Sequence, residues 1–153
     1  MSRILSGSKL VLCAVLLTGG LAACRSQVAD DPLPAPPLTQ PDETPFGDNV
    51  AFAVNRMIGR ITDGLNDGGH TVEERYYFVP DAAAAQALHA WYDPKAAAQG
   101  WERIGKLNVD PSRQERAFGY ARGKHAFVVA WLQRRGQGPV PLVTIRLERS
   151  KDR

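Results

Sequence analysis

The two residues best spaced for joint chemistry are His89 and Asp93, four positions apart in a helix-forming stretch. Side chains at i and i+4 share one face of a helix, and such a pair can ligate a metal ion. Asp93, however, directly precedes Pro94, an arrangement typical of a helix cap. His70 stands among glycines and His125 beside a turn, where solvated histidine is the ordinary state. We therefore expect no metal site and no cofactor.

Candidates for nucleophilic or acid–base catalysis are few. The serines after residue 24 lie outside any Gly-x-Ser-x-Gly pattern, the signature of a nucleophile elbow: Ser26, Ser112 and Ser150. The glutamates that could pair for glycoside hydrolysis have ordinary surface interpretations: Glu73, Glu74, Glu102 and Glu115. The glycines lack the spacing of a phosphate-binding loop. We expect no catalytic residues, and the chain is predicted not to be an enzyme.

The first 23 residues have the pattern of a secretory signal. Arg3 and Lys9 precede an apolar run at residues 10–17, and small residues follow. A basic start, an apolar run of this length and a small-residue end are typical of a cleaved leader. The run is too short to span a bilayer, which takes about 20 apolar residues. We expect residues 1–23 to be removed.

The end of this leader, Leu21-Ala22-Ala23-Cys24, resembles the lipobox of bacterial lipoproteins. The resemblance implies cleavage before Cys24, diacylation of its thiol and, in many bacteria, acylation of its amino group by a fatty acid such as palmitate. Two or three acyl chains anchor a protein stably, at about 0.8 kcal/mol per buried methylene. Arg25, where an inner-membrane lipoprotein has aspartate, implies the outer membrane, facing the periplasm. The alternative is an ordinary signal with an incidental cysteine.

Residues 24–48 are predicted to be a tether that carries the lipid. Residues 31–45 hold six of the eleven prolines of the chain. Proline favours extended polyproline II structure, and few apolar side chains are present to offset the entropy of ordering. The PxxP spacing at residues 34–37 also fits a proline-rich ligand for a partner domain. We expect a semi-stiff spacer between the membrane and a folded domain.

Residues 49–153 are predicted to form one small α+β domain, a two-layer sandwich of a mostly antiparallel sheet with one main helix, at about residues 81–99, packed on one face. Asp81 provides an N-cap and Gly100 a stop. Strand patterns occupy residues 74–79, 101–104, 116–121, 126–132 and 142–148. The run at 126–132 is the most apolar and is expected to be the central strand. Turns are expected at residues 122–124 and 133–138.

Side-chain orientation follows from periodicity. In the main helix, Ala84, Leu88 and Trp91 are expected to face the core, and Pro94 either kinks the helix or divides it. In the last strand, Val143, Ile145 and Leu147 are expected to point inward and Thr144, Arg146 and Glu148 outward. Residues 51–61 are open to helix or strand; we favour a helix with Phe52, Ile58 and Ile61 partly buried. Residues 63–69 have the turn residues of a loop.

A second resemblance concerns the domain itself. A strand leads into a helix with the pair Trp91-Tyr92, the helix ends at Gly100-Trp101, and strands follow. This order is similar to that of small envelope lipoproteins of unassigned role, over about residues 74–148. The motifs are packing motifs, so the resemblance implies the fold and no chemistry.

Positive charge is concentrated in the second half of the chain. The chain has a net charge of +3, whereas residues 24–49 carry −4 and residues 50–153 carry +5. We expect the basic meander to bind an envelope protein or an anionic cell-wall polymer; its candidate residues are Arg113, Arg116, Arg122, Lys124, Arg134 and Arg135. Nucleic acid is not expected in the envelope. The ordinary alternative is that these charges keep strand edges soluble.

Two functions remain open at this point. The first is a membrane-anchored, non-enzymatic binding or assembly module in the periplasm. The second is a small-ligand binder or hydrolase with a site between helix and sheet, near Trp91, Tyr92 and Trp101. A filled helix–sheet interface favours the first, and a concave site with converging polar groups favours the second.

Overall fold

The computed structural model describes residues 33–38, 46–65, 73–133 and 139–148. All of them belong to one compact unit, Asp31–Arg153. The predicted leader, Cys24, Arg134 and Arg135 lie outside the described residues, as do His70 and most of the predicted turn at 133–138. In the part of the chain that is described, neither helix combines the length and apolar character that a membrane crossing requires.

Five antiparallel strands form one sheet in the order β1-β5-β4-β3-β2. They are β1 Glu73–Val79, β2 Glu102–Arg103, β3 Glu115–Arg122, β4 His125–Leu132 and β5 Val140–Glu148. The predicted strands are therefore confirmed, with β4 at the centre and a β2 shorter than expected. The predicted turn between β3 and β4 is also confirmed, because Gly123 there adopts a positive φ of 55° that favours glycine.

The main helix, α2 (Ala82–Ala98), follows β1 as predicted. The Asp81 side chain caps it by accepting a hydrogen bond of 2.7 Å from the Ala84 amide, and Gly100 follows its end with a φ of 72°. Pro94 lies inside this single helix. Of the two alternatives, the one in which Pro94 divides the helix and Asp93 caps a second piece is wrong, because the helix is continuous; the Asp93 carboxylate accepts a hydrogen bond from the Tyr120 hydroxyl.

The face that α2 buries differs from the predicted one. Its core residues are Ala85, Leu88, Tyr92 and Ala96, while Trp91 is only partly buried at the edge of the cluster. The prediction placed Trp91 in the core and was wrong by one position. The alanine-rich sequence offers little hydrophobic contrast around the helix, so two adjacent aromatic residues could not be told apart by periodicity.

Residues 51–61 belong to a helix, as we favoured. This helix, α1, spans Asp48–Leu65 and buries Val54, Met57, Ile58, Ile61 and Leu65. Ile58 and Ile61 are buried as predicted, but Phe52 is 68% exposed. The helix also continues through residues 63–65, which the turn residues had assigned to a loop.

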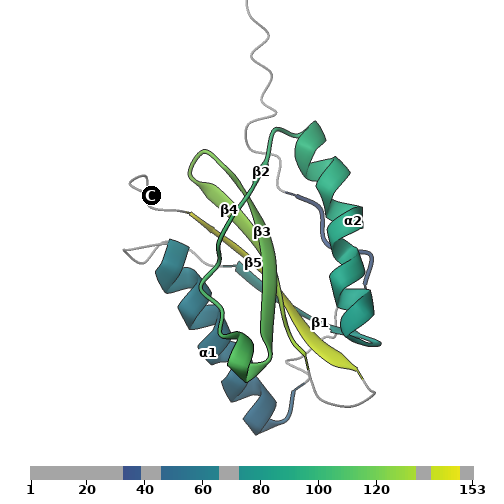
Figure 1. The fold of residues 1–153 in the computed structure, drawn as a ribbon, viewed down its shortest axis with the longest axis vertical. Coiled ribbons are helices and arrows are strands. Elements are labelled where there is room, and N and C mark those ends of the chain that lie inside the picture. Colours follow the sequence, from purple (N-terminus) through teal and green to yellow (C-terminus); the bar gives the residue numbers. More distant parts are fainter. Residues whose placement is uncertain (1–32, 39–45, 66–72, 134–138, 149–153) are drawn as a thin grey trace, which may run out of the picture. The chain divides into compact units, whose positions relative to one another are not determined.

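The two helices cover opposite faces of the sheet (Figure 1). Alternate residues of β4 show this directly, since Phe127, Val129 and Trp131 join the α2-side core while Val128 and Ala130 join the α1-side core. The α+β class, the antiparallel sheet and the helix on one face are confirmed. The second helix adds a layer that the sequence did not assign to a face.

Coverage of both faces explains two misplaced side chains on β5. Thr144 and Arg146 were predicted to point to solvent, yet Thr144 is only 4% exposed and Arg146 is partly buried. Both alternate with Val143 and Ile145 of the α1 side, and both therefore lie on the α2 side. The predicted alternation along β5 was correct, but the face assigned to solvent is covered by α2 and belongs to a second buried core.

Part of the predicted tether packs on the domain. Residues 33–38, which we call the N-terminal strap, lie on the α2 side, where Leu33 is fully buried and Leu38 is partly buried. The folded unit therefore begins before residue 49. The expectation of an unpacked spacer throughout residues 24–48 is wrong for this stretch.

Candidate interaction surface

The predicted basic residues that the structure describes fall at four places along and around β3. Arg116 and Arg122 stand at its two ends, and Arg113 belongs to the short helix η2 (Pro111–Arg113) just before it. Lys124 lies in the turn that follows. The structure therefore does not bring the predicted residues into one patch.

Ion pairs reduce the charge that two of these residues present. The Nε of Arg113 is 2.9 Å from the Asp110 carboxylate, and the Nζ of Lys124 is 3.1 Å from the Glu148 carboxylate. Pairs of this exposed kind contribute little to stability, but they leave a local net charge near zero. Arg113 and Lys124 are therefore weaker candidates for binding an anionic partner.

Three other side chains share one face of the sheet. Arg116 lies opposite Trp131, and Arg103 of β2 lies opposite Tyr120, both of which belong to the α2-side core. Arg122 is two positions after Tyr120 and points to the same side. We call Arg103, Arg116 and Arg122 the arginine row. Its ends are six residues apart on β3, about 20 Å at roughly 3.3 Å per residue.

Backbone carbonyl groups contact the guanidinium groups at both ends of the arginine row. Arg116 donates to the Glu115 carbonyl oxygen over 2.7 Å and reaches the Pro111 carbonyl oxygen at 3.5 Å. Arg122 donates to the Gln99 carbonyl oxygen over 3.0 Å, and its guanidinium lies 4.9 Å from the centre of the Trp101 ring. Carbonyl contacts of this kind orient the Arg116 guanidinium without cancelling its charge.

Arg103 marks the middle of the row and was not among the predicted site residues. Its guanidinium contacts the His89 ring, with Nη2 3.1 Å from Nδ1. The same His89 nitrogen lies 3.6 Å from the Asp93 carboxylate, which also accepts a 2.6 Å hydrogen bond from Tyr120. The Tyr120 hydrogen bond, with His89 and Arg103 nearby, lowers the pKa of Asp93 below its usual value. These four residues form the polar cluster at the middle of the row.

This geometry gives the spaced pair His89 and Asp93 a role other than metal binding. The Arg103 guanidinium occupies the side of the His89 ring where a cation would have to sit, and like charges repel. Among the described residues, no three His, Cys, Asp or Glu side chains gather in a way that could hold a metal. Only the pair spacing was visible in the sequence; the contact with Arg103 joins residues 14 positions apart.

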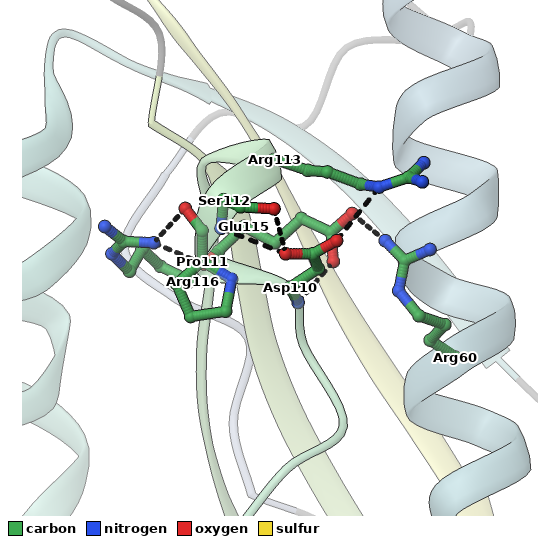
Figure 2. A network of polar contacts seen from close by, with 7 residues as sticks. All are labelled: Arg60, Asp110, Pro111, Ser112, Arg113, Glu115 and Arg116. Carbon is green, nitrogen blue, oxygen red and sulfur yellow. Dashed lines mark hydrogen bonds and ion pairs between the residues drawn. The ribbon is translucent and has the colours of Figure 1, made fainter.

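A second polar network lies on the other side of β3 (Figure 2). Glu115 is fully buried, and its carboxylate accepts hydrogen bonds from Arg60 of α1 and from the Asp110 amide, the latter over 2.8 Å. Asp110 in turn accepts from the Ser112 amide and hydroxyl at 3.0 and 2.6 Å. The surface interpretation of Glu115 is therefore wrong. Figure 2 shows Arg116 pointing away from Arg60 and α1, so this network and the arginine row face opposite sides.

The space between α2 and the sheet, where the alternative function would need a site, is occupied by aromatic side chains. Tyr92 is fully buried, with its ring centre 5.1 Å from Phe127 and 6.1 Å from Phe118. Trp101 is 8% exposed. Trp91 packs at the edge, where the Lys95 ammonium lies 4.0 Å from its ring centre. The residues named for a small-ligand site are thus core or edge-of-core residues.

Comparison with known proteins adds no assignment. No protein-family model matches this chain, and the searches against curated proteins and solved structures found no match either. The resemblances to the lipobox and to small envelope lipoproteins therefore remain predictions from the sequence, and the arginine row, its polar cluster and the α2-side core are the features on which a functional argument can rest.

Proposed function

We propose that this protein is a lipid-anchored lipoprotein of the periplasm, held at the outer membrane through Cys24, whose domain is a non-enzymatic binding module for an acidic partner. The leader and Leu21-Ala22-Ala23-Cys24 support the anchor. The arginine row supports the binding role, and it is the observation that carries this part of the proposal.

The arginine row suits an extended acidic face better than a small anion. Its three guanidinium groups follow one edge of the sheet over about 20 Å, a length that matches a protein surface and exceeds a single phosphate or carboxylate. Asp93 offsets part of the charge beside Arg103, so Arg116, which donates to carbonyl groups, is expected to attract the partner most strongly. Such complementarity speeds association and selects the partner.

Photocrosslinking in living cells tests the binding role. We would place a photoreactive residue at Gln86, which is exposed on α2 one turn before His89 and whose replacement leaves the arginines of the row in place. We expect one dominant protein adduct, and we expect Arg103→Glu with Arg116→Glu to reduce it at least tenfold, because two attractive charges become repulsive.

The matched control is Arg56→Glu, a charge reversal on an exposed residue of α1, on the opposite face of the sheet. It should leave the adduct unchanged. An adduct that survives reversal of Arg103 and Arg116, or that is lost equally with Arg56→Glu, would contradict the proposed surface. Crosslinking to a cell-wall fragment in place of a protein would show that the partner is a cell-wall polymer, and the arginine row would remain the binding surface.

A further inference from the structure

The N-terminal strap is held by side chains of the domain in a manner that resembles recognition of a peptide. The buried Tyr92 hydroxyl donates to the Pro34 carbonyl oxygen over 3.0 Å, and Arg146 Nη2 donates to the Leu33 carbonyl oxygen over 2.6 Å. Leu33 itself is fully buried in the α2-side core. Binding sites for extended proline-rich peptides commonly bury an apolar side chain of the peptide and donate hydrogen bonds to its carbonyl groups.

The strap is attached through these contacts and not through the sheet. In the part of the chain that is described, the five strands pair only with one another. Residues 33–38 take part in none of these strand pairings. Within the strap, the one backbone hydrogen bond runs from the Leu38 amide to the Pro36 carbonyl oxygen at 2.7 Å. The strap can therefore leave without breaking a ladder of hydrogen bonds.

Both side chains that bind the strap also have contacts within the domain. Arg146 is positioned by the Glu73 carboxylate at 3.5 Å, and its guanidinium lies 5.9 Å from the centre of the Phe127 ring. Tyr92 is fixed by its packing against Phe127 on the helix–sheet interface. Both donors would thus keep their places when the strap is absent, which is the property of a preformed site.

One further hydroxyl at this site is not used by the strap. Tyr77 is 1% exposed, and among the described residues its hydroxyl finds no hydrogen-bond acceptor. Tyr77 belongs to the same buried cluster as Tyr92 and Leu33, and burial together with the nearby Tyr77 raises the pKa of Tyr92. A buried donor without an acceptor costs free energy. The strap therefore leaves one hydrogen-bond donor of the site, the Tyr77 hydroxyl, without an acceptor among the described residues.

We propose that Tyr77, Tyr92 and Arg146 form a binding slot for an extended Leu-Pro segment of a partner protein, and that the N-terminal strap is the chain's own occupant of that slot. A partner segment that also offers an acceptor to Tyr77 would displace the strap. This site is separate from the arginine row and does not depend on the lipid anchor.

A peptide-rescue experiment tests the slot. In the full chain in detergent micelles, Leu33→Asp should expel the strap, because a carboxylate cannot occupy the apolar position of Leu33. We expect a lower melting temperature, restored by a synthetic peptide of residues 31–38. The unchanged chain should respond at least tenfold less, since its tethered strap competes at an effective concentration on the order of millimolar.

Two comparisons decide the outcome. A peptide with the same Leu33→Asp change should give no rescue, and Tyr92→Phe in the Leu33→Asp chain should weaken rescue about three- to tenfold by removing one donor. The proposal is overturned when the two peptides act alike, or when several millimolar of the unchanged peptide restores nothing. Should Leu33→Asp leave the domain unfolded, Leu33→Ala opens the slot with less disruption and supports the same comparison.

Discussion

Glu115 is the residue whose environment differs most from what its type suggests. A carboxylate at zero exposure is strongly destabilising unless charged and polar donors replace its water. Arg60 and the Asp110 amide provide that replacement, and they come from α1 and from the segment before η2. The ion pair between Arg60 and Glu115 therefore connects helix α1 to the start of β3, two parts of the chain that are far apart in the sequence.

Arg60→Met should lower the free energy of unfolding by about 3 kcal/mol, because it leaves the Glu115 carboxylate buried without its counter-charge. Chemical denaturation monitored by tryptophan fluorescence would measure the change. Arg56→Met, one turn earlier and exposed, should shift stability by less than about 0.5 kcal/mol. Equal effects of the two substitutions would show that the Glu115 ion pair does not stabilise the fold.

The burial of Glu115 could not be predicted from the sequence, because its partner is 55 positions away. The same limit applied to Asp93, whose spacing to His89 was visible but whose bond to Tyr120 spans 27 positions. Residue types and short spacings identified groups able to form polar contacts. Which contacts they form was decided by the docking of α1 and α2, which no local pattern encodes.

Local signals were reliable where they act within an element. The Asp81 cap, the glycine stop and the turn between β3 and β4 all depend on neighbouring residues, and all were confirmed. Orientation toward another element was less reliable. On β5 the alternation was read correctly, yet Thr144 faces a second core, since α2 covers the side that had been assigned to solvent.

Helix α2 offers a direct comparison of two adjacent aromatic residues. Tyr92→Ala should lower the free energy of unfolding by about 3–5 kcal/mol, because a fully buried ring is removed. Trp91→Ala should cost only about 1–2 kcal/mol, since that ring is partly exposed and its Lys95 contact is worth roughly 0.5–1 kcal/mol. Thermal melting would rank them. A larger effect at Trp91 would mean that the helix packs as the periodicity had suggested.

The N-terminal strap changes the reach of the proposed tether. A spacer running from Cys24 to residue 48 would extend about 80 Å at roughly 3.3–3.6 Å per residue. With Leu33 fixed in the core, nine residue steps remain after Cys24, which span at most about 30 Å. The proposed anchor would therefore keep the domain close to the bilayer, and a partner of the arginine row would be a neighbour at the same membrane.

The anchor itself is tested most directly by the two cysteines. Cys24→Ala should move the protein from the membrane fraction to the soluble fraction after a carbonate wash, because the acyl chains have no other attachment point. The melting temperature of the domain should stay the same, since Cys24 precedes the first described core residue by nine positions. Cys13→Ala is the matched control and should leave fractionation unchanged, as that cysteine is expected to depart with the leader. Continued membrane association of the Cys24→Ala protein would contradict lipidation and leave the leader as an ordinary secretory signal.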